Sequence, residues 1–171
     1  SHLLPFTILA EGTNFARIRA IDRIILCSEC DLFPKLPGMH PMNRHIVEEL
    51  EPITLVGGGG LGSDDLAAAL ALAPVLVAAD GGAAAVLAAG HVPSAVIGDF
   101  DSLPQDVRDR LPPECLHPVA EQDSTDFDKA LRGIAAPVVL AVGFLGGRVD
   151  HQLAAFNTLV QGHQTPCVLI G

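Results

Sequence analysis

The chain has 171 residues, of which 49% are hydrophobic and 18% charged, and its mean hydropathy is +0.41. This composition is typical of one globular domain and excludes disordered and collagen-like proteins. The formal net charge is −10, all of it from the acidic excess after position 41, and the sequence has no Trp and no Tyr. An acidic surface without these aromatic rings argues against nucleic-acid binding.

The apolar segments are too short to cross a membrane. The longest, Leu66–Ala79, covers 14 residues and is interrupted by Pro74, whereas a helix that spans a bilayer needs about 20. The N-terminus has no basic region before Leu3–Ala10, so a secretion signal is not supported. We therefore expect no membrane partner and a cytoplasmic location.

Four cysteines allow two readings. Cys27 and Cys30 form a CxxC pattern, which is compatible with a redox motif or half of a zinc site, but Cys115 and Cys167 stand alone. Because no second CxxC is present, we expect reduced thiols of a cytosolic protein rather than metal or redox chemistry.

Residues 1–41 differ in pattern from the rest of the chain. Pro34, Pro37, Gly38 and Pro41 are typical of a linker. We expect an N-terminal extension over 1–41, to which the sequence assigns no role, and a folded domain over 42–171.

From position 53 onward, short β-rich runs alternate with segments of helical length, which predicts repeated βα units. Almost wholly apolar strands favour an open, three-layer, mostly parallel sheet of Rossmann-like type with helices on both faces. Its ligands are expected at the carboxyl ends of the strands. In chain order the predicted elements are strand Ile53–Val56, helix Ser63–Leu72, strand Val75–Ala79, helix Ala83–Ala89, strand Ala95–Ile97, helix Gln105–Arg110, strand Cys115–Val119, helix Ser124–Ile134, strand Val138–Val142, helix Val149–Gln161 and strand Cys167–Ile170.

A glycine-rich turn follows the first of these strands. Gly57, Gly59 and Gly62 fit the pattern G-x-G-x-x-G, and Asp80 ends the next strand 18 residues later. This is the arrangement of a dinucleotide-binding fold, in which the acid would bind ribose. Exposed backbone N–H groups at such a turn suit any phosphate, so the motif indicates phosphate more strongly than NAD.

Two carboxylates follow the third predicted strand. In an extended chain Asp99 and Asp101 would point to the same side, with Cα atoms about 7 Å apart. Their mutual repulsion favours a bound cation, and Mg²⁺ is the natural occupant of a site with oxygen ligands. The alternative is a solvated acidic loop in which Asp101 or Ser102 caps the next helix.

A third acidic group opens the helix predicted after the fourth strand. Phe127, Ala130, Leu131 and Ile134 form its buried stripe, which leaves Asp126 and Lys129 on another flank within reach of each other. Asp123 is placed to cap this helix, and such a structural role is as compatible with the pattern as a functional one.

The fifth strand is followed by Gly146-Gly147-Arg148-Val149-Asp150-His151. The glycines allow close approach of a ligand, and Arg148 is suited to phosphate oxygens. His151 fits either a catalytic or a structural role. Carboxylates at several strand ends would repel a nucleotide unless a divalent metal lay between them, and this combination is typical of metal-bridged phosphoryl transfer.

The ordered set of motifs resembles the thiamine pyrophosphokinase family. The matching segments are Ala79-Asp80-Gly81-Gly82-Ala83, Gly98-Asp99-Phe100-Asp101-Ser102, Gln122-Asp123-Ser124-Thr125-Asp126 with Lys129, and Gly146-Gly147-Arg148-Val149-Asp150-His151. The resemblance implies Mg²⁺-dependent transfer of diphosphate from ATP to the hydroxyl of thiamine, which gives thiamine diphosphate and AMP. It also implies a homodimer.

The resemblance assigns roles residue by residue. It implies that Asp80, Asp99, Asp101 and Asp126 hold Mg²⁺ and the triphosphate and that Arg148 acts with them in catalysis; Asp99 or Asp101 would orient the hydroxyl. The nucleotide and its phosphates are expected to contact a further set of residues: Gly57, Gly58, Gly59, Gly60, Gly81, Gly82, Asp123, Ser124, Thr125, Lys129, Gly146 and Gly147.

This chain departs from the family pattern in two places. The β-sandwich domain that follows the catalytic domain in the family is expected to be absent here, and residues 1–41 are additional. Two alternatives stay open from the sequence: an NAD-dependent oxidoreductase that uses Gly57–Gly62 and Asp80, and a non-catalytic nucleotide-binding module.

Overall fold

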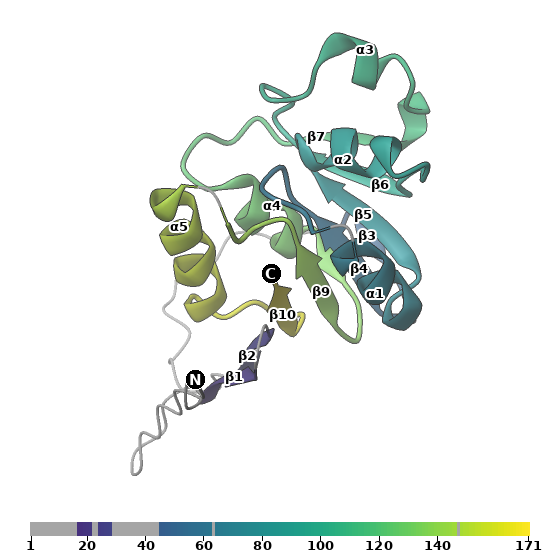
Figure 1. Ribbon diagram of the computed structural model, residues 1–171. Helices are drawn as coiled ribbons and strands as arrows, with labels where there is room; N and C mark the ends of the chain where they lie inside the picture. The colour runs from purple at the N-terminus through teal and green to yellow at the C-terminus, as the bar shows by residue number, and fades with distance from the viewer. Residues whose placement is uncertain (1–16, 22–23, 29–44, 63, 147) are drawn as a thin grey trace.

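The computed structural model describes residues 17–21, 24–28, 45–62, 64–146 and 148–171 (Figure 1). Eight strands form one sheet in the order β1-β2-β10-β9-β4-β5-β6-β7, and β3 pairs with β8 in a small second sheet. The strands are β1 (Arg17–Ile21), β2 (Ile24–Ser28), β3 (Val47–Glu48), β4 (Ile53–Val56), β5 (Val75–Ala79), β6 (Ala95–Gly98), β7 (Leu116–Pro118), β8 (Ile134–Ala135), β9 (Val139–Val142) and β10 (Cys167–Ile170).

The helices are α1 (Asp65–Leu72), α2 (Gly82–Ala88), α3 (Gln105–Arg108), α4 (Asp126–Arg132) and α5 (Val149–Val160), with a 3₁₀ turn at Pro113–Cys115. None of the helices in the described part of the chain has the length and hydropathy of a membrane-crossing segment.

The strands from β10 to β7 pair in parallel, and β2 adds to β10 in the antiparallel direction. The chain runs outward from β4 through β5, β6 and β7, then returns to β9 on the other side of β4. The direction of winding therefore reverses between β4 and β9. In open α/β sheets the carboxyl edge at such a reversal is where ligands bind.

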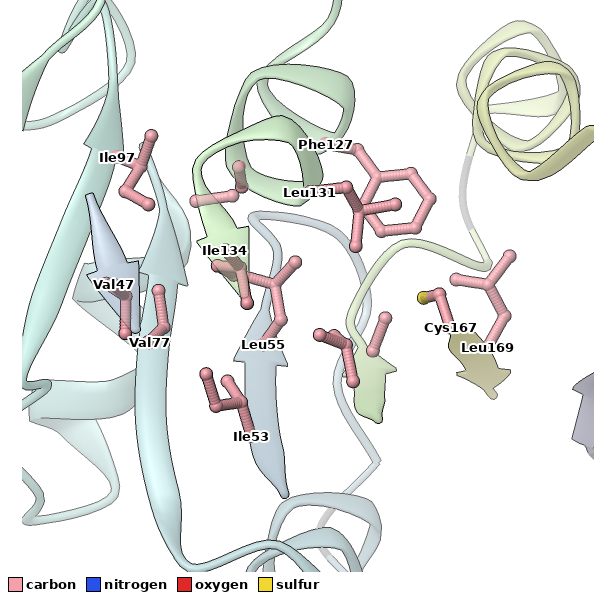
Figure 2. Packing of buried hydrophobic residues seen from close by; sticks show 14 of the residues in the cluster. Val47, Ile53, Leu55, Val77, Ile97, Phe127, Leu131, Ile134, Cys167 and Leu169 are labelled. Atoms are coloured by element: carbon pink, nitrogen blue, oxygen red, sulfur yellow. The ribbon is translucent and has the colours of Figure 1, made fainter. Parts of the chain in front are cut away.

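Each face of the sheet is covered by its own helices. On one face, Ile53 and Leu55 of β4 pack with Phe127 and Leu131 of α4 and with Leu159 of α5, and Figure 2 shows the first four of these side chains converging in one layer. On the other face, α1, α2 and α3 pack against alternate strand residues. The three-layer α/β class predicted from the sequence is confirmed.

Thr54 illustrates how a polar residue is accommodated in a strand buried on both faces. Its side chain is fully buried between the apolar residues Ile53 and Leu55. The hydroxyl donates a hydrogen bond to the carbonyl oxygen of Ala73, just past the end of α1, at 2.7 Å. Burial of the hydroxyl is thus compensated, and the end of α1 is attached to β4.

The predicted strands and helices are all present, with ends that differ by up to two residues. Ile134, expected in the last turn of a helix, instead begins β8, because Gly133 ends α4 and the chain then pairs with Val47 of β3. Four strands were not predicted, namely β1, β2, β3 and β8. The proline-rich stretch expected to be a linker lies outside the described residues.

Candidate functional site

Asp80 lies directly after β5 in an uncommon backbone conformation, with φ of +39°. Gly98, at the end of the neighbouring strand, leaves space for the Asp80 side chain, because a Cβ at position 98 would lie only 2.8 Å from the Asp80 Cβ. The residue is 2% exposed. Its Oδ2 accepts a hydrogen bond from the Ser102 backbone N–H at 3.1 Å, while its buried Oδ1 has no hydrogen-bond partner in the described structure.

Asp99 follows β6, and the chain turns sharply after it. Phe100 has a φ of +66°, its ring is buried, and the Arg108 guanidinium lies 5.3 Å from the ring centroid. The extended geometry expected across Asp99–Asp101 is therefore wrong. Asp101 is exposed, and its backbone N–H donates to Asp99 Oδ1 at 3.2 Å.

The third acidic residue, Asp126, opens α4. Thr125 caps this helix, because its hydroxyl accepts a hydrogen bond from the Asp128 backbone N–H at 3.2 Å. The capping role predicted for Asp123 is wrong, and that residue is exposed in the preceding loop. To predict which residue caps a helix, the position where the loop ends must be known to within one residue. The sequence pattern does not determine that position.

Lys129 lies one turn further along α4 and points at the acids. Its side chain is only 2% exposed, and its Nζ lies 2.7 Å from Asp99 Oδ2 and 3.0 Å from Asp126 Oδ1. The sequence predicted the contact with Asp126. The contact with Asp99 depends on the packing of α4 against β6, which local spacing does not reveal.

Asp80, Asp99 and Asp126 form one acidic cluster, in which each offers an oxygen within 4.8 Å of the other two. Burial, together with the negative charge of Asp126, raises the pKa of the Asp80 carboxyl. The hydrogen bond from Lys129 lowers the pKa of Asp99. Burial opposes the charged form of Lys129, but its hydrogen bonds with Asp99 and Asp126 outweigh burial and raise the pKa of the ammonium.

The donor set of this acidic cluster fits a hard divalent cation such as Mg²⁺, which takes carboxylate oxygens. The buried Asp80 Oδ1 supports the fit, since a carboxylate oxygen removed from water without a hydrogen bond is costly unless a cation or proton compensates it. Of the four aspartates predicted to hold the metal, the structure brings three together and leaves Asp101 outside the group.

The glycine turns meet at the carboxyl edge, next to the reversal between β4 and β9. The Gly59 N–H donates to the Gly143 carbonyl at 2.8 Å, and a Cβ at Gly57 would lie 2.7 Å from the same oxygen. A Cβ at Gly82 would lie 2.1 Å from the Val56 carbonyl oxygen. These glycines therefore permit close backbone packing, whereas Gly60 is exposed with open space around it.

Arg148 and its neighbours lie outside the acidic cluster. The Arg148 guanidinium pairs with the Asp150 carboxylate through Nε to Oδ1 at 3.1 Å and through a second contact to Oδ2, and its side chain is 72% exposed. The hydrogen bond from Arg148 lowers the pKa of Asp150. His151 is exposed, Gly146 has a φ of +85°, and Gly147 lies outside the described residues.

A second polar network on α4 was not predicted from the sequence. Arg132 contacts Glu121 Oε2 at 2.9 Å, Ser124 Oγ at 2.7 Å and Asp128 Oδ2 at 2.8 Å. It thereby attaches the loop that carries Asp123 to the helix. An open pocket of about 360 Å³ adjoins this loop between α4 and α5, and its lining includes Gln122, Asp123, Ser124, Thr125 and Asp128.

The remaining predicted binding residues lie at or near this edge. Gly58 lies close to the Gly81–Gly82 backbone, at the start of α2.

Cys115 and Cys167 are buried, as expected of structural thiols. Cys30 lies outside the described residues.

Fold and geometry together define an open α/β protein with a candidate divalent-metal site at the carboxyl edge of its sheet. The family model described as "Thiamin pyrophosphokinase, catalytic domain" matches residues 66–170. This match covers more than half of the chain, and the chain belongs to the thiamine pyrophosphokinase family.

Two curated relatives agree with this assignment. Thiamine pyrophosphokinase of Bacillus subtilis (strain 168) is 35% identical over 95 residues, which covers 52% of this chain and 44% of the relative. Thiamine pyrophosphokinase 1 of Arabidopsis thaliana is 33% identical over 92 residues, 47% of this chain and 34% of the relative. The matched segments thus cover less than half of each relative's length.

Solved structures give the same result. The crystal structure of thiamine pyrophosphokinase from Bacillus subtilis aligns with a TM-score of 0.57 at 30% identity, covering 70% of this chain and 60% of that one. The enzyme from Geobacillus thermodenitrificans aligns with a TM-score of 0.56 at 32% identity, covering 70% and 59%.

Proposed function

We propose that this chain is the catalytic part of a Mg²⁺-dependent thiamine diphosphokinase, which transfers diphosphate from ATP to the hydroxyl of thiamine and releases AMP. The observation that carries the proposal is the acidic cluster of Asp80, Asp99 and Asp126, whose oxygens converge at the ligand-binding edge of the sheet. Family membership supports the choice of thiamine and ATP as substrates. The NAD alternative fits less well, because it leaves Asp99 and Asp126 without a role.

In this proposal the cluster holds the metal and the glycine turns contact the nucleotide. Magnesium bound to the three carboxylates would neutralise charge on the phosphate oxygens. Gly60 has room for a ligand at its backbone, and Gly58 lies beside the backbone at the start of α2. Asp123, Ser124 and Thr125 shape the side of the site next to α4, where they line the open pocket.

The transfer itself is a substitution at the β-phosphorus of ATP. The thiamine hydroxyl oxygen bonds to that phosphorus, the bond from it to the oxygen bridging to the α-phosphorus breaks, and AMP leaves with the electron pair. Little covalent chemistry is required of the protein, so positioning and charge neutralisation are its main contributions. The hydroxyl proton passes to solvent or to a carboxylate, for which exposed Asp101 is our candidate.

Arg148 is proposed to bind phosphate oxygens once a nucleotide is present. Its fork of donors is paired with Asp150 in this structure and is largely exposed, so it can exchange one anionic partner for another at low cost. Exposed ion pairs of this kind contribute little to stability.

The proposal is tested by the products. Purified protein is incubated with ATP, thiamine and Mg²⁺, and AMP and thiamine diphosphate are measured by chromatography. We expect AMP only when all three are present, and its loss in Asp99→Asn and Asp126→Asn but not in Asp106→Asn, an exposed acid on α3 that serves as the matched control. ADP as the product, or Mg·ATP binding without turnover, would contradict the proposed reaction.

Three further expectations remain proposals. Residues 42–171 are proposed to form the catalytic domain and residues 1–41 an extension of it. The other two are a homodimer, which the family resemblance implies, and a cytoplasmic location. Sedimentation of the intact chain and of a 42–171 fragment tests the first two together, with a folded fragment and a dimer mass as the expected results.

A further inference from the structure

Lys129 is buried in the middle of the candidate metal site rather than at its surface. Its side chain is 2% exposed, and two of the three donors of its ammonium are directed at carboxylates, Asp99 Oδ2 at 2.7 Å and Asp126 Oδ1 at 3.0 Å. A lysine whose role is to bind phosphate would be expected to have an exposed ammonium group without carboxylate partners. Its partners in this structure are two of the three members of the acidic cluster.

The position of Lys129 affects the net charge of the candidate metal site. When a cation occupies the acidic cluster, its three ionised carboxylates carry three negative charges, and Lys129 compensates one of them. The remaining two equal the charge of a single divalent cation. Ionised carboxylates have about four lone-pair sites each, so Asp99 and Asp126 can bind Lys129 and a metal at once.

We propose that Lys129 is a fixed counter-ion of the metal site: a positioning residue that holds Asp99 and Asp126 together and matches the site to a cation of charge two. The inference rests on the proposed function, because it assumes that the acidic cluster binds Mg²⁺. It replaces the role of phosphate ligand that the family resemblance implied for Lys129.

Loss of the ammonium charge should therefore change which cation the site prefers. Without it the site has three uncompensated negative charges, which favour a trivalent cation over a divalent one. At the distances between Lys129 and the carboxylates, one unit charge is worth enough to change relative affinities about tenfold or more. A lysine that only packs α4 against the sheet would have no such effect.

The experiment compares Tb³⁺ with Mn²⁺, both of which bind carboxylate oxygens. Mn²⁺ affinity is measured by electron paramagnetic resonance and Tb³⁺ affinity by its displacement of bound Mn²⁺ in the same experiment, in the wild-type chain and in Lys129→Met. We expect the preference for Tb³⁺ over Mn²⁺ to rise about tenfold or more in Lys129→Met.

Two double variants separate charge from structure. Asp99→Asn/Lys129→Met again has two uncompensated charges, and its cation preference should return towards that of the wild type. Asp106→Asn/Lys129→Met is the matched control, because it removes an exposed acid of α3 that lies outside the cluster, and it should keep the altered preference.

Each result decides between the two hypotheses. If wild-type chain binds neither ion, the proposed metal site fails. If it binds Mn²⁺ and Lys129→Met shows the same preference as the wild type, the counter-ion role fails while the metal site stands. A Lys129→Met chain that is unfolded alone but regains its circular dichroism spectrum with Tb³⁺ supports the role, and one that stays unfolded with Tb³⁺ contradicts it.

Discussion

Gly98 controls how closely the ends of β5 and β6 approach each other, and through this the position of Asp80. A Cβ at Gly98 would lie 2.8 Å from the Asp80 Cβ, a distance that side-chain carbons do not tolerate. Gly98→Ala should displace Asp80 from the acidic cluster. We expect a loss of about ten- to a hundredfold in Mn²⁺ affinity and of about 1–3 kcal/mol in the free energy of unfolding.

Isothermal titration with Mn²⁺ and urea denaturation measure these two effects. Gly60→Ala is the matched control, since the nearest atom to its Cβ is 4.0 Å away and the residue lies on the same edge of the sheet. Equal Mn²⁺ affinity in Gly98→Ala and wild-type chain would show that Asp80 does not depend on this close approach.

At the level of single residues, the sequence located most of the candidate site. The family resemblance assigned Asp80, Asp99 and Asp126 to the metal. Their placement at one edge followed from the rule that the carboxyl ends of parallel strands meet there, which needs only the order of elements. Asp101 was grouped with them on the assumption of an extended chain, and the positive φ of Phe100 breaks that assumption. The inward direction of Lys129 requires the packing of α4, which spacing does not contain.

Among the helices, α4 carries both Asp126 and Lys129, so the cap that starts it positions the site. Thr125→Ala removes the hydroxyl that accepts the Asp128 N–H and leaves a helix-end donor unpaired. We expect a loss of about 1 kcal/mol in the free energy of unfolding, measured by urea denaturation.

Two variants check that this loss comes from the cap. Thr125→Ser keeps the hydroxyl and should retain most of the stability, whereas Asp123→Ala, at the position the sequence predicted to cap, should change it by less than about 0.5 kcal/mol. A larger effect at Asp123 than at Thr125 would contradict the observed cap.

The end of α4 shows which features of an element can be predicted from local sequence and which cannot. The buried stripe of Phe127, Ala130 and Leu131 was correct because helical periodicity determines it. Ile134 continues the same period, yet it lies in β8, since its backbone pairs with Val47 from a distant part of the chain. The short strands β3 and β8 are two residues each, and no local pattern of that length is distinctive.

For the molecule as a whole, His163 connects the segment before β10 to the polar network of α4. Its Nε2 lies 3.1 Å from the Thr158 carbonyl oxygen and 3.4 Å from Asp128 Oδ1, with Arg132 on the other side of the same carboxylate. Burial lowers the pKa of this ring below its ordinary 6.5, although Asp128 partly opposes the shift.

The direction of the shift determines how stability depends on pH. The unfolded chain takes up the His163 proton near pH 6.5, whereas the folded protein does so only at a lower pH. Between these values the unfolded state binds more protons, so the contribution of His163 to stability is complete above pH 6.5 and is lost as the pH falls through the folded pKa.

His163→Gln should remove this part of the pH dependence. The free energy of unfolding is measured by urea denaturation at pH 7.5, 6.5 and 5.5 with EDTA present, so that metal binding does not contribute. As the pH is lowered, the free energy of unfolding of the wild type should decrease relative to that of His163→Gln. The reason is that the unfolded wild-type chain binds a proton at His163 more readily than the folded protein does, and glutamine does not titrate. His151→Gln, at an exposed position, is the matched control.

The opposite outcome is a difference in the free energy of unfolding between wild type and His163→Gln that stays constant across this pH range. It would mean that the His163 ring titrates alike in the folded and unfolded states. The packing of His163 against α4 would then not lower its pKa.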